Sequence, residues 1–89
     1  MTIGILGLGL IGGSLARAYK KAGCIVYVCE KDKRMLDFAQ LADVVDCELD
    51  NSNIASCDLI LLAIYADAAA SWLEDNAPYI SKEAIVIDC

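Results

Sequence analysis

The stretch Gly7-Leu8-Gly9-Leu10-Ile11-Gly12-Gly13-Ser14-Leu15-Ala16 (GLGLIGGSLA) decides the fold, because it places four glycines in ten residues directly after a short apolar run. Inside a helix or strand each glycine costs about 0.5–1 kcal/mol relative to alanine, so another requirement must select glycine here. Residues 1–6 (MTIGIL) are apolar, which is typical of a buried strand. The stretch therefore predicts a turn that leaves a strand and opens a helix.

A helix is predicted from about residue 11 to residue 22, followed by a second strand over residues 24–29. The helix carries basic residues in its last turn, and Gly23 supplies the stop. Its apolar residues recur at helical spacing: Leu15, Ala18, Tyr19 and Ala22. The strand CIVYVC shows no polar alternation, as expected when both faces of a parallel sheet are covered.

The rest of the chain continues this alternation of strands and helices. Helices are predicted over residues 33–41 and 67–76, with Asp32 and Asp67 as their N-caps. Strands are predicted over 57–64 and 84–88, with at most a short one around Val44 and Val45. Phe38 and Trp72 lie at helical spacing with other apolar residues and are interpreted as core. The pattern predicts an α/β fold with a doubly wound, Rossmann-like parallel sheet in one domain, residues 1–89.

The composition excludes several classes of partner. The chain has 13 acidic and 7 basic residues, a formal charge of −6, so nucleic acid and anionic membranes are not expected to bind. No apolar run reaches membrane-spanning length and no signal peptide is apparent, so a cytoplasmic location is expected. There are five scattered cysteines and no histidine, and no metal site is predicted.

Each glycine of the pattern Gly7-x-Gly9-x-x-Gly12 has a physical role when the pattern follows a strand and opens a helix. Gly7 makes the tight turn, Gly9 lets the backbone approach a pyrophosphate, and Gly12 lets the helix pack closely. The free N–H groups of the helix N-terminus favour a diphosphate. Ser14, in the first turn, is predicted either to bond a phosphate oxygen or to satisfy the helix end. The loop residues Gly7, Leu8, Gly9, Leu10, Ile11 and Gly12 are therefore candidate cofactor contacts.

Glu30 ends the second strand, where a carboxylate accepts hydrogen bonds from the adenosine ribose. Because a carboxylate repels a 2′-phosphate, NAD is favoured over NADP. The alternative is that Lys31, Lys33 and Arg34 hold that phosphate and Glu30 turns away. Lys31 is counted among the cofactor contacts in either case.

Three residues that follow the fourth predicted strand, Ala63, Ile64 and Tyr65, are also candidate cofactor contacts. Ligands of open α/β sheets bind in a crevice at the carboxyl ends of the strands, and these residues lie at that edge. Asp88 ends the last strand at the same edge, and its role is left open. No residue of the chain is assigned a catalytic role.

The sequence resembles the N-terminal nucleotide-binding part of prephenate dehydrogenases over essentially all of its length. The resemblance rests on the decapeptide of residues 7–16, the acidic Glu30, the strand DLILLAI at residues 58–64, and the closing IVIDC. Arogenate dehydrogenases look alike over this region. The chain departs from the family at Tyr65, where members commonly have proline, which leaves the cofactor contact of this loop open.

The resemblance implies NAD-dependent oxidative decarboxylation of prephenate to 4-hydroxyphenylpyruvate, a step of tyrosine biosynthesis. It also implies a catalytic histidine, substrate-binding arginines and a helical dimerisation domain. This chain has no histidine, and Arg17 and Arg34 are its only arginines. A sixth strand would lie beyond Cys89, so the chain is expected to be the inactive NAD-binding fragment of a larger enzyme, which itself takes the small-molecule substrate. Its apolar edge predicts homo-oligomers. The alternative is a stand-alone module that senses nucleotides.

Overall fold

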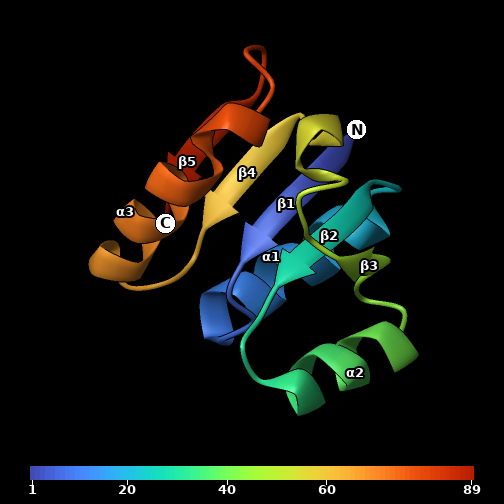
Figure 1. Cartoon of the computed structure of the whole chain (residues 1–89). Helices are drawn as coiled ribbons and strands as arrows, with labels where there is room; N and C mark the ends of the chain where they lie inside the picture. The colour runs from blue at the N-terminus through green and yellow to red at the C-terminus, as the bar shows by residue number, and fades with distance from the viewer.

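The computed structural model describes all 89 residues, which form one five-stranded parallel sheet with helices on both faces (Figure 1). The strand order is β3-β2-β1-β4-β5. The elements are β1 (Thr2–Leu6), α1 (Leu10–Lys21), β2 (Ile25–Cys29), α2 (Lys33–Leu41), β3 (Cys47–Glu48), η1 (Ile54–Ser56), β4 (Leu59–Leu62), α3 (Ala66–Asn76), η2 (Ala77–Tyr79) and β5 (Ile85–Asp88). The predicted α/β class with a Rossmann-like sheet is confirmed.

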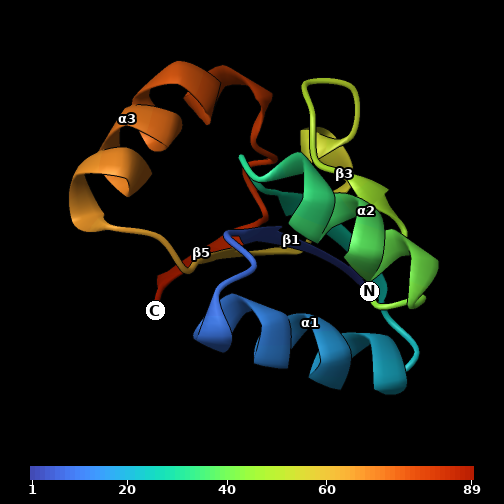
Figure 2. The same ribbon diagram turned by 90° about the horizontal axis from the view of Figure 1, so that it is seen from below.

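Alternate residues of the central strand divide the core into two layers. Ile3 and Ile5 of β1 face α1 and α2, whereas Leu6 faces α3 and the segment around η1. Figure 2 shows α1 and α3 on opposite sides of the sheet. The strongest apolar runs of the sequence supply the three central strands, β1, β2 and β4, because these strands are covered on both faces.

The register of the sheet brings three loops together at one edge. Leu6 pairs with Cys29 of β2 and with Leu62 of β4, so these three strands end side by side. After β3 the chain returns across the sheet, and β4 pairs with the free side of β1. The strand order therefore reverses between β1 and β4. In open α/β sheets the crevice at such a point is where ligands bind.

The third strand lies three residues later than predicted, at Cys47–Glu48 instead of Val44 and Val45. Val45 is buried in the core, but it belongs to the connection that follows α2. The chain turns at Asp43, which has a positive φ of 57°. The chain therefore starts to pair with β2 at Cys47, after this turn and the connection that follows it.

The interpretation of Phe38 as a core residue is wrong, because its side chain is 69% exposed. The buried residues of α2 are Leu36 and Ala39. A nine-residue helix offers only a narrow buried face, and Phe38 lies off that face. The prediction for Asp32 is confirmed, since its side chain accepts a hydrogen bond from Arg34 N.

The predicted N-cap of α3 is also wrong by two residues. Tyr65 is the N-cap and its side chain makes no capping bond, whereas Asp67 lies inside the first turn. A carboxylate in the first turn still stabilises the helix through the helix dipole. At the end of α1 the prediction holds, because Gly23 adopts a φ of 90° directly after the C-cap.

Asp46 joins α1 to the start of β2 and makes folding stability depend on pH. Its carboxylate accepts hydrogen bonds from Val26 N and from Lys20, whose Nζ also lies 3.7 Å from Asp43. Partial burial alone would raise the pKa of Asp46, but the bonds from Lys20 and Val26 N lower that pKa below its usual value. The stabilisation is therefore present at neutral pH and is lost as the pH falls through the lowered pKa.

We expect Asp46→Asn to lower the urea midpoint of unfolding at about pH 7, by the small amount typical of an exposed ion pair, and to have a smaller effect at about pH 3. The asparagine keeps an acceptor for Val26 N, but it removes the charge and the acceptor that faces Lys20. Asp37→Asn serves as the control, because the Asp37 carboxylate joins no ion pair and lies in the middle of α2, away from both helix ends. A midpoint difference of the same size at both pH values would contradict the prediction.

Candidate functional site

The glycine loop is packed so tightly that two of its positions admit no side chain. Gly7 has a φ of 92°, and a Cβ there would lie 2.6 Å from the carbonyl oxygen of Ala63. A Cβ on Gly12 would lie 1.9 Å from the carbonyl oxygen of Gly7. Helix α1 therefore meets the loop at backbone contact distance, and the structural roles predicted for Gly7 and Gly12 agree with this geometry.

The N-terminus of α1 is a backbone cradle that opens to solvent. Its N-cap is Gly9, which provides no side-chain cap, and a Cβ on Gly9 would meet nothing within 4 Å. The first helical amides, of Leu10, Ile11 and Gly12, have no acceptor within the helix. No acidic residue lies in the first turn. The charge and shape of this cradle fit an anion that approaches the backbone closely.

Glu30 is held at the rim of the glycine loop by two backbone amides. Its Oε1 accepts a hydrogen bond from Leu8 N at 2.8 Å, and its Oε2 accepts one from Asp32 N at 2.9 Å. Each carboxylate oxygen keeps a free lone pair, so the group can accept further hydrogen bonds from hydroxyls. The alternative in which Glu30 turns away from the loop is not the conformation seen here.

A cavity of about 300 Å³ lies beside Glu30, between the ends of the strands and α3. Its walls are mainly apolar and its rim is charged. The lining residues are Leu6, Gly7, Cys29, Glu30, Lys31, Ile64, Ala68 and Trp72. Burial raises the pKa of the Cys29 thiol, with the charges of Glu48 and Glu30 adding to the effect, so the wall there stays neutral. A planar heterocycle fits such a cavity, with a hydroxylated sugar at Glu30.

The three residues that follow β4 lie in three different surroundings. Ala63 packs against the glycine loop, with its Cβ 3.4 Å from the position of a Cβ on Gly12. Ile64 lines the cavity, whereas Tyr65 is 90% exposed and does not line it. The geometry thus includes two of the three residues predicted at this edge and leaves Tyr65 outside.

Two residues of α3 that line the cavity, Ala68 and Trp72, were not predicted as site residues. Trp72 packs against the second core layer as predicted, and it is also part of the cavity wall. Ala68 and Trp72 are separated by one helical turn in the helix that follows β4, which is the signal that sequence reasoning overlooked. Ser14 makes no side-chain hydrogen bond to the N-terminus of α1, and its contact with a phosphate oxygen stays a prediction.

The structure contains no group of three or more histidine, cysteine or carboxylate side chains that could hold a metal ion. All five cysteines are free thiols. None of the helices has the length and apolar character needed to cross a bilayer.

A five-stranded Rossmann-like sheet with an open glycine loop and an anchored strand-end carboxylate is typical of a dinucleotide-binding domain. The chain belongs to the family described as NADP oxidoreductase coenzyme F420-dependent, whose model matches residues 2–89. A comparison with curated proteins finds no match.

Solved structures with the same fold include several dehydrogenases. Synechocystis arogenate dehydrogenase is 31% identical, with a TM-score of 0.89 over 99% of this chain and 32% of that one. Prephenate dehydrogenase from A. aeolicus, in complex with hydroxyphenyl propionate and NAD+, is 18% identical, with a TM-score of 0.84 over 99% of this chain and 32% of that one. Mycobacterium tuberculosis 3-hydroxyisobutyrate dehydrogenase is 20% identical, with a TM-score of 0.85 over 98% and 30%. The chain spans about a third of the length of each.

Proposed function

We propose that the chain binds NAD, with the pyrophosphate on the N-terminus of α1, the ribose hydroxyls on Glu30, and adenine in the cavity against Ile64 and Trp72. The observation that supports this most strongly is the pair of backbone hydrogen bonds that hold Glu30 at the rim of the open glycine loop. The cradle begins at Gly9, the residue after Leu8, and Glu30 itself lines the cavity. A dinucleotide is the ligand that would use all three features.

The choice of NAD over NADP rests on Glu30. In the proposed complex a 2′-phosphate would lie next to the Glu30 carboxylate, whose two oxygens are fixed by Leu8 N and Asp32 N. The two negative groups would repel each other. The competing feature is the group of basic residues that follows, Lys31, Lys33 and Arg34, all of which are exposed. Exposed cations contribute little per pair, so we expect the anchored carboxylate to decide the preference.

Gly9→Ala is the sharpest test of the pyrophosphate site. The added methyl meets no protein atom within 4 Å and Gly9 has a φ of −64°, so the fold is expected to be unchanged. If the pyrophosphate packs on this backbone, the methyl displaces it and NAD affinity falls about tenfold or more. Trp72 is the only tryptophan, so quenching of its fluorescence by NAD reports binding directly.

Gly23→Ala is the control, because it makes the same chemical change far from the site and should leave NAD affinity unchanged. The φ of 90° at Gly23 means that this variant is expected to be somewhat less stable. Thermal unfolding followed by circular dichroism separates loss of fold from loss of binding. Unchanged NAD quenching in a folded Gly9→Ala protein would contradict the proposed placement of the pyrophosphate.

We further propose that the chain is the nucleotide-binding part of a dehydrogenase acting on prephenate or arogenate. The support is the sequence of the glycine loop together with the 31% identity to an arogenate dehydrogenase over 99% of this chain. The test is formation of NADH by the product of the whole gene with prephenate or with arogenate as substrate. Activity with 3-hydroxyisobutyrate and with neither of these would overturn the proposal.

We also propose that the 89-residue chain self-associates through β5. Ile85 and Ile87 of this edge strand are 61% and 45% exposed, and Val86 is exposed as well, so apolar side chains and unpaired backbone groups face solvent together. Such an edge favours pairing with another strand. We expect light scattering to show a dimer or larger species at high concentration and Ile87→Lys to shift it toward monomer. A wild-type chain that stays monomeric would exclude this interface.

A further inference from the structure

A second ligand-sized space, the α1–α2 groove, lies on the other face of the sheet from the cavity at Trp72. Its volume is about 350 Å³, and it separates the two helices that cover this face. Small residues line it from both helices, Gly13 from α1 and Ala39 and Ala42 from α2. The groove exists because these small side chains do not fill the space between the helices.

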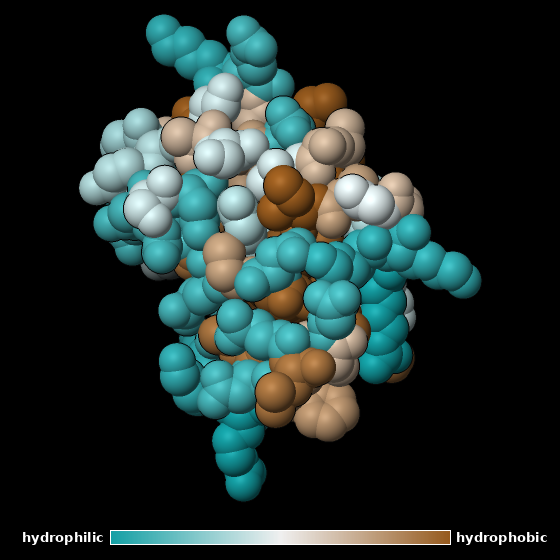
Figure 3. Space-filling model, turned by 90° about the vertical axis from the view of Figure 1, so that its right-hand side faces the viewer, coloured by the Kyte–Doolittle hydropathy of each residue, from teal (hydrophilic) through white to brown (hydrophobic).

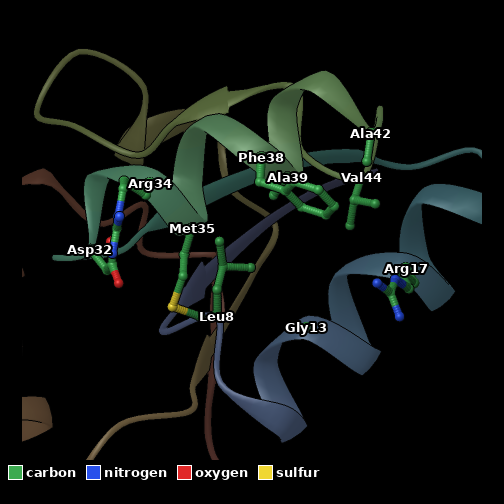
Figure 4. A pocket seen from close by; sticks show the side chains of 10 residues that line it. All are labelled: Leu8, Gly13, Arg17, Asp32, Arg34, Met35, Phe38, Ala39, Ala42 and Val44. Atoms are coloured by element: carbon green, nitrogen blue, oxygen red, sulfur yellow. The ribbon is translucent and has the colours of Figure 1, made fainter.

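The groove has an apolar middle. Figure 4 shows Leu8, Met35 and Phe38 gathered between the two helices. Figure 3 shows apolar side chains collected among polar ones at the lower end of the face that carries α2. Phe38, which leaves its ring largely in solvent, forms a wall on which a flat apolar group can stack.

One end of the groove carries a cation without a partner. Arg17 of α1 lines it beneath Val44 (Figure 4), and both ion pairs of the molecule are made by Lys20, so the guanidinium of Arg17 has no carboxylate within 4.0 Å. An arginine presents several donors in a planar fork that matches a carboxylate.

The charge distribution of the chain favours an anion at this place. Although the net charge is −6, six of the seven basic residues lie between residues 17 and 34, on α1, at the start of α2 or in the connection before α2. The acidic residues are spread over the rest of the molecule, with eleven of the thirteen after residue 34. The charged residues that line the groove are Arg17, Arg34 and Asp32, so the lining itself carries a net positive charge that attracts an anion.

We propose that the α1–α2 groove is a second binding site, which takes a small aromatic carboxylate. The ring lies against Phe38, Met35 and Leu8, and the carboxylate pairs with Arg17. This combination of an apolar wall and one placed charge is typical of small-molecule sites. The proposal does not depend on the identity of the nucleotide.

The groove lies directly behind the candidate nucleotide site. The side chains of Leu8 and Asp32 line it, and the backbone N–H groups of these same two residues hold Glu30. A ligand in the groove thus touches both residues that anchor the carboxylate without entering the cavity at Trp72. The amide signals of Leu8 and Asp32 are expected to report its binding.

Phenylacetate is the probe, with the neutral phenylacetamide as its matched analogue, in an NMR titration of the 15N-labelled chain. We expect saturable shifts of the amides of Leu8, Gly13, Arg17 and Phe38 with a Kd of about 1 mM, as befits so small a ligand. Phenylacetamide is expected to bind about tenfold more weakly. Arg17→Gln removes this difference, whereas Lys21→Gln, one turn further along the same helix and outside the groove, keeps it.

A second variant tests whether the ligand occupies the groove itself, without changing Arg17. Ala42→Leu adds bulk at the end of α2 and is expected to block phenylacetate while leaving Arg17 in place. Saturating NAD should not displace phenylacetate, because the two sites are separate. Equal affinity for the acid and the amide, shifts centred on Trp72, competition with NAD, or no binding at about 10 mM would each overturn the proposal. All of these outcomes except the competition are independent of whether NAD itself binds.

Discussion

Gly12→Ala is expected to destabilise the protein by about 3 kcal/mol or more and to abolish NAD binding. The new Cβ would lie 1.9 Å from the carbonyl oxygen of Gly7 and 2.9 Å from its carbonyl carbon, both of which are backbone atoms that no rotamer change can move aside. Either α1 moves away from the loop or the loop opens, and both changes disrupt the N-terminal cradle. Overpacking of this kind costs more than the loss of a surface contact. For a domain of this size the loss is a large share of the total stability.

Gly13→Ala is the matched control, one residue further along the same helix. A Cβ on Gly13 meets only the carbonyl oxygen of Leu8 at 3.5 Å, an ordinary contact. Alanine in place of glycine within a helix adds about 0.5–1 kcal/mol of stability. Urea unfolding followed by circular dichroism should therefore move in opposite directions for the two variants. If both variants lose or both gain stability, the close packing of α1 on the loop is not what selects glycine at residue 12.

The central part of the fold could be predicted because local sequence decides it. The apolar runs of β1, β2 and β4 need no distant contact to be recognised, since β1 and β4 are buried on both faces and β2 is fully buried on one. The turn at Gly7 is encoded just as locally, because only glycine readily adopts its positive φ.

The features that were missed depend on contacts between distant parts of the chain. The connection to β3 is tied to β2 by Asp46, which accepts a hydrogen bond from Val26 N twenty residues earlier, and no local pattern marks the start of that strand. Phe38 fits the helical spacing of α2 as well as Leu36 does, and only the angle at which the helix meets the sheet decides which of them is buried.

The same limit applies to the candidate site. The glycine loop and Glu30 were recognised because their spacing follows from one strand-turn-helix-strand unit. The cavity wall formed by Ala68 and Trp72 comes from a helix more than fifty residues after the loop. Its place beside Glu30 follows from the sheet order, in which β4 pairs with β1.

Glu30→Gln is expected to weaken NAD binding about 10- to 100-fold and to bring the affinities for NAD and NADP close together. The carboxylate accepts from two backbone amides and, in the proposed complex, from the ribose hydroxyls as well. A glutamine side chain has one acceptor oxygen and one NH2 group, so one of the two amides, Leu8 N or Asp32 N, faces a donor. Hydrogen bonds to a charged acceptor contribute about 1.5–3 kcal/mol each, which corresponds to the expected fold-change.

The affinity for NADP should change in the opposite direction or stay the same, because removing the carboxylate also removes its repulsion of the 2′-phosphate. Asp37→Asn, which removes the same charge from the exposed surface of α2, is the control for the net charge and should leave both affinities unchanged. Quenching of Trp72 by each nucleotide at low and high ionic strength completes the test, since salt screens the repulsion of NADP in the wild-type chain. A wild-type preference for NADP that Glu30→Gln leaves intact would show that Lys33 and Arg34 hold the phosphate and that Glu30 does not select the nucleotide.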